Sequence, residues 1–507
     1  MKIKNIEALR LNVPHHETKT KPWREPWSTT AEVANPMSRY PKVKAHRSMW
    51  FPKWESVWCK VTLEDGTVGY GQTGHGRPVA AVIDDHFSPQ LIGEDIMAGV
   101  HPLLKLVRAS VDVERRQARA SFLGFATREA EFRPGLGCTL ALGAPVKALS
   151  LASQDMSSRA PPAAPPLPSA APPADVDVRK LRTAVDSAFD EPDPREPRRT
   201  RALVVMYRGK VIAERYAPGF TGETPLIGWS MSKSVTGVLV GMLVKEGRLS
   251  LDASSLVPQW RGAHDPRARI TLDEMLRMTS GLHFNEDYDD PLSDVALMIF
   301  TQPDEPAFAA GKPLDAAPGT RWEYSSGTSA ILASVIRQAL GGTAEDYLEF
   351  PRRALFDPLG MRTAVFEPDA AGMLASAAFV SASAHDWVRF GQFLLQDGVW
   401  NGTRLLPAGW VRYMSSVTAL SPRHDFGAHA WVRVPEPFDS HSHNQEWPGP
   451  SLPADAFHVV GHEGQFVSVI PDRELVVVRL GLSRPESAWD HEAFLARLLA
   501  AIPAGKR

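Results

Sequence analysis

The sequence predicts an α+β fold in which antiparallel strands alternate with helices, and two observations support this prediction. Apolar segments at residues 202–207 and 211–215 are separated by Arg208-Gly209, a pattern typical of two strands joined by a tight turn. The segment 234–244 is apolar on all sides and is followed by Lys245-Glu246-Gly247, which indicates a buried helix that a glycine terminates. Further strand and helix patterns continue to about residue 499.

Composition excludes several classes of function. The chain has 507 residues with 56 Lys plus Arg and 58 Asp plus Glu, so its net charge is −2. This balance argues against nucleic acid or an anionic membrane as the main partner. The most apolar later stretch, residues 136–152, is interrupted by two glycines, a proline and a lysine, so no membrane span is expected. Its pattern instead favours a glycine-punctuated strand or turn.

Composition also divides the chain. Residues 1–97 show a strand, a long aromatic and basic loop, a hairpin around Glu64-Asp65-Gly66 and a helix. Residues 98–156 form an extension, residues 157–175 a Pro/Ala-rich linker or surface strap, and residues 176–507 one large domain. The first 14 residues lack the apolar core of a signal peptide, which favours a cytoplasmic location. Cys59 and Cys138 allow one disulfide at most.

The strongest chemical signal is Ser230-Met231-Ser232-Lys233 at the start of the apolar helix. Residues three apart share a helix face, so the Lys233 amine is expected beside the Ser230 hydroxyl. A serine needs a nearby base to become a nucleophile, and a buried lysine can be that base because burial lowers its pKa. Taken alone, the motif fits equally well a surface helix with an incidental serine and lysine.

Two further segments favour the catalytic interpretation. Tyr324-Ser325-Ser326 stands at the entrance of another apolar helix and can bring a phenol and a hydroxyl into one pocket, although a capped helix start explains it as well. Gly461-His462-Glu463-Gly464-Gln465 lies between two apolar segments, as the turn at a strand edge does.

From about His101 to the end, these three motifs together resemble the class C β-lactamase and penicillin-binding protein group of serine hydrolases. Within that group the chain is most similar to 6-aminohexanoate-dimer hydrolases and related esterases. Supporting stretches are Met278-Thr279-Ser280-Gly281-Leu282, Asp357-Pro358-Leu359-Gly360-Met361 and Asp386-Trp387-Val388-Arg389-Phe390-Gly391. The resemblance implies a β-lactamase/transpeptidase-like domain, with an antiparallel sheet flanked by helices and a helical subdomain.

The resemblance also implies roles for individual residues. Ser230 resembles the acylated nucleophile, Lys233 its base, and Tyr324 the residue that passes a proton to the leaving group. The backbone N–H groups of Ser230 and Gln465 resemble an oxyanion hole. Residues matching substrate contacts are Tyr288, Ser326, His462 and Gly464.

Two departures from β-lactamases shape the expected substrate. Ser326 replaces the usual asparagine, and His462 stands where Lys-Thr-Gly has its lysine. Histidine is only partly charged near pH 7, so it anchors a substrate carboxylate weakly. We therefore expect a small-molecule amide or ester substrate, with no cofactor and no metal. His441 and His443 lack acidic partners at a convincing spacing for a metal site.

Residues 1–97 resemble a different family, the N-terminal capping domain of enolase-superfamily sugar-acid dehydratases such as L-rhamnonate dehydratase. The matching segments are residues 1–4, 61–71 and 91–95. That family's metal-binding carboxylates lie on a barrel missing here, so this fragment is expected to be catalytically silent, and its junction near residues 94–100 suggests a fusion.

Two alternatives to the serine hydrolase remain: a non-catalytic penicillin-binding-like sensor and a Mg²⁺-dependent dehydratase.

Overall fold

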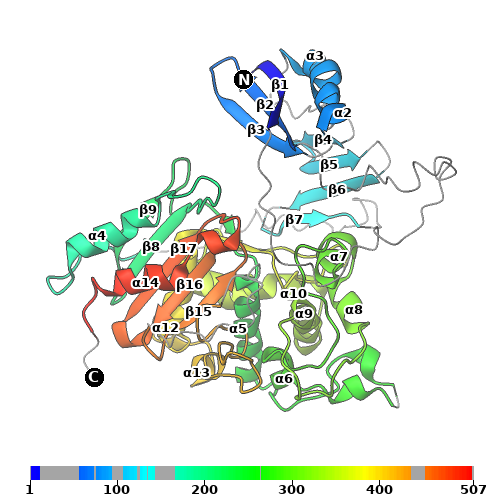
Figure 1. The fold of residues 1–507 in the computed structure, drawn as a ribbon. Coiled ribbons are helices and arrows are strands. Elements are labelled where there is room, and N and C mark those ends of the chain that lie inside the picture. Colours follow the sequence, from blue (N-terminus) through cyan, green and yellow to red (C-terminus); the bar gives the residue numbers. More distant parts are fainter. Residues whose placement is uncertain are drawn as a thin grey trace. The chain divides into compact units, whose positions relative to one another are not determined.

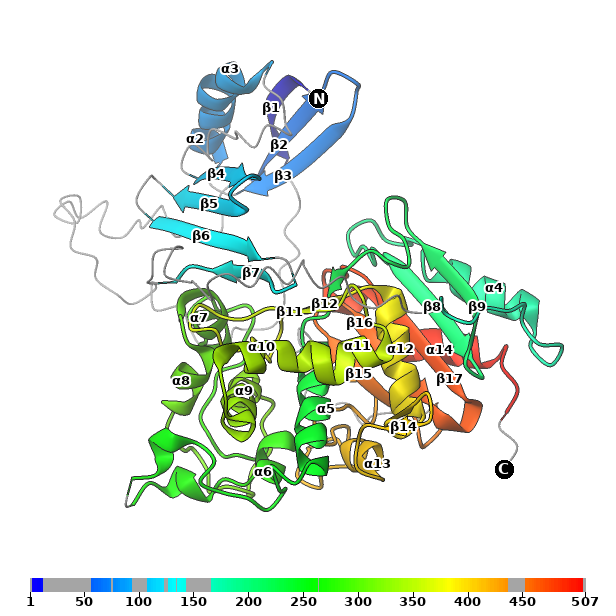
Figure 2. The same cartoon turned by 180° about the vertical axis from the view of Figure 1, so that it is seen from behind.

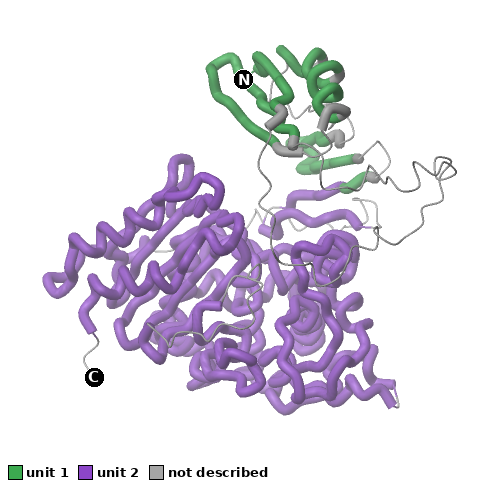
Figure 3. Tube along the Cα trace, viewed as in Figure 1, with its two compact units in different colours: residues 1–128 green, residues 129–507 purple. Residues whose placement is uncertain are grey.

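A computed structural model describes residues 2–11, 56–73, 76–93, 107–122, 126–133, 135–142, 166–262, 264–435 and 452–504. The chain divides into two compact units, Met1–Arg128 and Glu129–Arg507 (Figure 3). The boundaries expected at residues 97, 156 and 175 stay predictions. No helix in the described ranges is both long and apolar enough to cross a membrane. His441 and His443 lie outside these ranges.

The first unit contains a small antiparallel sheet and a helical segment, as the sequence predicts. Its strands pair in the order β1-β2-β3. Leu63 N–H donates to the carbonyl of Thr67 over 2.9 Å, which closes the expected hairpin. Bounds in this unit are β1 Ile3–Leu11, β2 Ser56–Leu63, β3 Val68–Thr73, α2 Gly76–Ala81, η3 Val82–Phe87, α3 Ser88–Leu91, β4 Val107–Asp112 and β5 Gln117–Phe122. Ile6, Val57 and Ile83 are among the buried side chains between sheet and helix.

The second unit is built on a five-stranded antiparallel sheet in the order β15-β16-β17-β8-β9 (Figure 1). The strands are β8 Ala202–Tyr207, β9 Lys210–Tyr216, β15 Phe457–Gly461, β16 Gln465–Ile470 and β17 Leu475–Leu480. The predicted turn between β8 and β9 is confirmed: Arg208 and Gly209 have φ of 49° and 72°. The outermost strands, β15 and β9, are far apart in sequence, so the sheet joins the two ends of this unit.

Both faces of the sheet are covered by helices, which explains why its central strands are apolar throughout. Alternate residues of β8 point to opposite faces. Val204 and Met206 pack in the cluster with α5 and α12, whereas Leu203 and Val205 pack in the cluster with α4 and α14. The helices are α4 Val178–Ser187, α5 Met231–Lys245, α12 Ala384–Leu395 and α14 His491–Leu499. Figure 2 shows α12 on the face opposite α14.

A helical region lies beside the sheet and packs against α5 through α9. Its helices are α6 Leu272–Leu276, α7 Asp294–Thr301, α8 Glu305–Ala310, α9 Ser326–Leu340 and α10 Ala344–Pro351, followed by η10 Arg352–Phe356 and α11 Asp357–Leu359. Short strands β10 Leu226–Ile227, β11 Val365–Phe366 and β12 Val380–Ala382 form a separate small sheet. The antiparallel sheet with flanking helices and a helical region confirms the predicted fold class.

Part of the proline-rich segment is a surface strap. Val211 N–H donates to the carbonyl of Pro168 over 2.8 Å, and Ala170 N–H donates to that of Val211 over 3.1 Å. The strap therefore hydrogen-bonds along the free side of β9. Of the predicted linker, residues 157–165 lie outside the described residues.

The segment before the strap forms a hairpin of β6 Ala126–Arg133 and β7 Gly137–Leu140. Within the second unit, the Cys138 N–H donates to Glu367 and the Thr139 hydroxyl donates to the carbonyl of Pro368. Of the strand or turn expected within residues 136–152, the beginning is a strand. Cys59 and Cys138 are both free thiols.

Candidate active site

Ser230 stands immediately before α5, as the sequence predicts. Its predecessor Trp229 has a φ of 49°, a left-handed conformation that bulky residues rarely adopt. The indole of Trp229 donates to Glu463 over 3.2 Å, and the Gly228 N–H donates to the carbonyl of Val380 over 2.8 Å. These contacts hold the backbone in a strained turn just before the helix, the kind of strain that clusters at functional sites.

Lys233 lies one turn into α5 and is almost fully buried. Its amine lies 3.0 Å from each of three acceptors: the Ser230 hydroxyl, the Ser326 hydroxyl and the carbonyl of Ala377. Burial lowers the pKa of Lys233 to about 8, against the opposing charge of Glu286. With this pKa about a tenth of the amine is uncharged at pH 7, far more than for an ordinary lysine, and this form can accept a proton.

Tyr324 approaches the same amine from the segment before α9. Its ring centroid is 5.0 Å from the Lys233 amine, and its hydroxyl hydrogen-bonds with Ser230. Burial, reinforced by the charge of Glu286, raises the pKa of Tyr324 above its ordinary value, so the phenol keeps its proton at neutral pH. Ser230, Lys233 and Tyr324 thus lie together, as the predicted catalytic group requires.

Ser326 begins α9 and links Lys233 to a carboxylate that the sequence interpretation did not single out. The Ser326 hydroxyl donates to Glu286 over 2.5 Å, and the Ser326 N–H donates to the other oxygen of Glu286 over 2.8 Å. Glu286 also accepts a hydrogen bond of 2.7 Å from the Tyr288 hydroxyl. The acidic loop of residues 285–290, which contains Glu286 and Tyr288, therefore contributes to the site.

Tyr288 and His462 face each other at the site, from the acidic loop and from the β15–β16 turn. Their rings are stacked with centroids 5.4 Å apart. His462 also contacts Trp229 edge to face and forms an ion pair with Glu486. Burial alone lowers the pKa of His462, but the hydrogen bond and charge of Glu486 more than offset it, so the net pKa is raised. The cationic form of His462 is thus already paired with an anion.

The turn after β15 contains the other predicted residues. Glu463 and Gly464 have φ of 62° and 81°, and a side chain at Gly464 would collide with Arg479. Gln465 begins β16, and its amide donates to the carbonyls of His462 and Gly481 over 3.1 and 2.8 Å. The Gln465 side chain therefore braces this hairpin, and the oxyanion role of its backbone N–H stays a prediction.

Gly461 allows strand β15 to approach the turn that holds Ser230. A Cβ at Gly461 would lie only 2.0 Å from the carbonyl oxygen of Gly228. Backbone atoms cannot rotate away as a flexible side chain can, so even alanine would force the two segments apart. The absence of a side chain at Gly461 therefore sets the spacing between strand β15 and the turn that precedes α5.

Gly461→Ala is expected to destabilise the protein by about 1–3 kcal/mol, because it overpacks a close backbone contact. Chemical denaturation monitored by fluorescence would measure the loss. Gly262→Ala is the matched control, since a Cβ there meets nothing within 4 Å. Equal stabilities of the two variants would contradict the close-contact argument.

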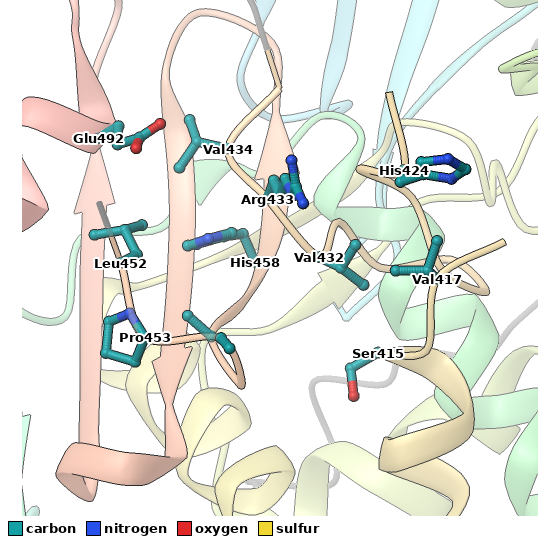
Figure 4. Close-up of a pocket in the computed structure, with 12 residues that line it drawn as sticks. Ser415, Val417, His424, Val432, Arg433, Val434, Leu452, Pro453, His458 and Glu492 are labelled. Atoms are coloured by element: carbon teal, nitrogen blue, oxygen red, sulfur yellow. The ribbon is translucent and has the colours of Figure 1, made fainter. Parts of the chain in front are cut away.

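The second unit also contains a hollow of about 150 Å³ (Figure 4). It is lined by Val417, Val432, Arg433, His458 and Glu492, among others, and by none of the residues described above. His458 is fully buried there and its pKa is lowered by burial to about 3, so it is uncharged at neutral pH. The lining of the hollow thus includes none of the groups around Ser230.

The geometry around Ser230 suits acyl transfer. A hydroxyl lies at a helix start, where backbone N–H groups favour developing negative charge. A buried amine with a lowered pKa is within hydrogen-bond distance of it, and a protonated phenol is beside both. A hydroxyl, an amine that can accept its proton and a phenol that can donate one are therefore together in one place.

Comparison with known proteins identifies the family of the chain. The "Beta-lactamase" family model matches residues 185–501, more than half of the chain. The chain is 27% identical over 294 residues to a 6-aminohexanoate-dimer hydrolase from Paenarthrobacter ureafaciens, a match that covers 55% of this chain and 72% of the relative. It is 29% identical over 217 residues to the esterase EstB from Burkholderia gladioli, covering 38% of this chain and 53% of the relative.

Two solved structures share the fold. One, provisionally assigned as a 6-aminohexanoate-dimer hydrolase from Bacillus anthracis, superposes with a TM-score of 0.52 at 22% identity, over 68% of this chain and 90% of its own. Another, provisionally assigned as a β-lactamase from Bacteroides dorei, has a TM-score of 0.50 at 19% identity, over 64% and 99%. The resemblance of residues 1–97 to an enolase-type cap stays a prediction, since the family match begins at residue 185. The chain belongs to the Beta-lactamase family, and it is a serine hydrolase of that family.

Proposed function

We propose that the protein hydrolyses an amide or ester bond of a small molecule through an acyl-enzyme on Ser230. The observation that carries the proposal is the 3.0 Å contact between the Ser230 hydroxyl and the Lys233 amine, whose pKa of about 8 makes it a usable base. In the first step the Ser230 oxygen attacks the carbonyl carbon of the substrate while its proton passes to Lys233. The backbone N–H groups of Ser230 and Gln465 stabilise the oxyanion.

Tyr324 then supplies the proton for the leaving group. Its raised pKa supports this role, because the phenol holds its proton until the amine or alcohol departs and is then reprotonated by Lys233. Water attacks the acyl-enzyme in the second half of the cycle, and Ser230 regains its proton. No step of this reaction requires a metal or an organic cofactor.

The surroundings of His462 favour a neutral amide or ester over a β-lactam with its carboxylate. The charge of His462 is offset by Glu486, and Glu286 adds a further carboxylate nearby. A substrate anion therefore meets no unpaired cation among these described groups. The similarity to a hydrolase of a 6-aminohexanoate dimer supports amides, and the similarity to EstB supports esters. We also propose that residues 1–97 take no part in the chemistry.

A fluorophosphonate probe tests the proposal on the full-length protein. Intact mass should rise by one probe adduct, and peptide mapping should place it on Ser230. A panel of linear amides, short-chain esters, a D-Ala peptide and a cephalosporin should then show faster turnover of the amides or esters. Labelling without product release would favour the non-catalytic sensor, and labelling of another residue would contradict the proposal.

A further inference from the structure

Glu286 stands at the end of a hydrogen-bond chain that starts at the nucleophile. The Lys233 amine contacts the hydroxyls of Ser230 and Ser326, and Ser326 in turn contacts Glu286 over 2.5 Å. Glu286 binds the backbone N–H of Ser326 with its second oxygen. The carboxylate therefore holds Ser326 at two points, and it acts on Lys233 through this hydrogen-bonded serine as well as through its charge.

The chain has a fixed direction because an ionised carboxylate only accepts hydrogen bonds. The hydroxyl proton of Ser326 must point to Glu286, so the Ser326 oxygen can only accept from Lys233. The carbonyl of Ala377 also only accepts from Lys233. An uncharged Lys233 amine has two N–H bonds and one lone pair. Both N–H bonds are used by these acceptors, and the lone pair is left for the proton of Ser230.

The same carboxylate balances the charge of Lys233. The other titratable groups that act on this amine are Glu305 on α8, Tyr324 before α9 and His429 in the segment that precedes β15. Burial raises the pKa of Glu305 well above its usual range, which favours its uncharged form, and burial lowers the pKa of His429 to about 4, so His429 is uncharged near pH 7. Tyr324 keeps its proton. Of the two carboxyl groups that raise the pKa of Lys233, Glu286 has the larger effect, and it is the one linked to the amine through Ser326.

We propose that Glu286 is a positioning residue that acts through Ser326: it directs the Lys233 lone pair toward Ser230 and balances the ammonium formed when Lys233 takes the Ser230 proton. The inference rests on the proposed function and adds to it the residue that determines when Lys233 can act as a base. It also assigns Ser326 a part in orienting the base, in addition to any contact with substrate.

Glu286→Gln tests the proposal through the pH dependence of kcat/KM for whichever neutral ester or amide the wild type hydrolyses. Loss of the negative charge should move the midpoint of the acidic limb down by about one pH unit, since an opposite charge nearby favours the charged amine. The plateau should fall by about 10- to 100-fold, because a glutamine amide can donate to Ser326 and release its hydroxyl to compete for the Lys233 lone pair.

Controls separate this role from a structural one. Glu345→Gln removes the same charge from an exposed position on α10 and should leave both midpoint and plateau unchanged. Glu286→Asp keeps the charge, so the midpoint of its acidic limb should lie close to that of the wild type. In a double-mutant cycle, Ser326→Ala should remove most of the further effect of Glu286→Gln on the plateau, because both variants break one chain.

An unmoved midpoint in a folded Glu286→Gln variant, as judged by an unchanged Tm, would overturn the inference. If that variant fails to fold, Glu286→Asp takes its place: the retracted carboxylate should move the midpoint in the same direction by less, and an unmoved midpoint again counts against it. Either result leaves the acyl-enzyme proposal intact as long as the wild type turns over substrate and Ser230 is labelled.

Discussion

Replacing Ser230 by alanine is expected to lower kcat/KM for an amide or ester by a factor of at least about 10⁴, because the group that forms the acyl-enzyme is lost. The residual rate would reflect binding and oxyanion stabilisation alone. Steady-state kinetics with the best substrate of the panel measures the effect, and intact mass spectrometry of a quenched reaction tests whether an acyl adduct still forms.

Ser334→Ala is the matched control for the Ser230 variant. Ser334 lies on α9, where its hydroxyl donates to the carbonyl of Ile331 over 2.8 Å. Its replacement by alanine removes the same hydroxyl oxygen from a helix residue that has no contact with the candidate site. Its activity should equal that of the wild type. A Ser230→Ala variant that kept a tenth or more of the wild-type rate would show that the nucleophile lies elsewhere.

Lys233→Met is expected to lower kcat/KM by about 10³-fold and to change the shape of its pH profile. In the wild type, activity should rise as the pH increases through about 8, because only the uncharged amine accepts the Ser230 proton. Methionine fills a similar apolar volume but carries no lone pair of that basicity, so the residual activity should lack this rise.

Lys245→Met provides the comparison for the Lys233 variant. Lys245 is exposed in the last turn of the same helix, and its replacement should alter neither the rate nor the pH profile. Thermal unfolding of both variants checks that the helix is intact. A Lys233→Met variant whose activity still rises through pH 8 would assign that titration to another group.

Local sequence patterns were sufficient for much of the fold. The β8–β9 hairpin depends on a turn whose two residues adopt positive φ, and α5 depends on an uninterrupted apolar segment, so both could be predicted from neighbours in the chain. Local patterns do not give the order of the strands, because the pairing of β17 with β8 joins segments more than 250 residues apart. The resemblance to a family predicted an antiparallel sheet flanked by helices, but it gave no strand order.

The candidate site shows the same division. The spacing of Ser230 and Lys233 follows from helix geometry, and their contact is the one that was expected. Glu286 could not be identified in this way, since an acidic residue in a polar loop has the same sequence signal whether it is solvated or bound to Ser326. The carbonyl of Ala377 is invisible to any side-chain motif, because every residue carries one.

The groups around the nucleophile come from α5, from the loop before α7, from the start of α9 and from the β15–β16 turn. No short stretch of the chain brings them together, so the reactive arrangement exists only once distant segments have docked. The fraction of molecules that a covalent reagent needing this arrangement modifies would therefore measure the fraction that is correctly folded in a preparation. The fraction modified at saturation should fall in step with the native population as denaturant is added.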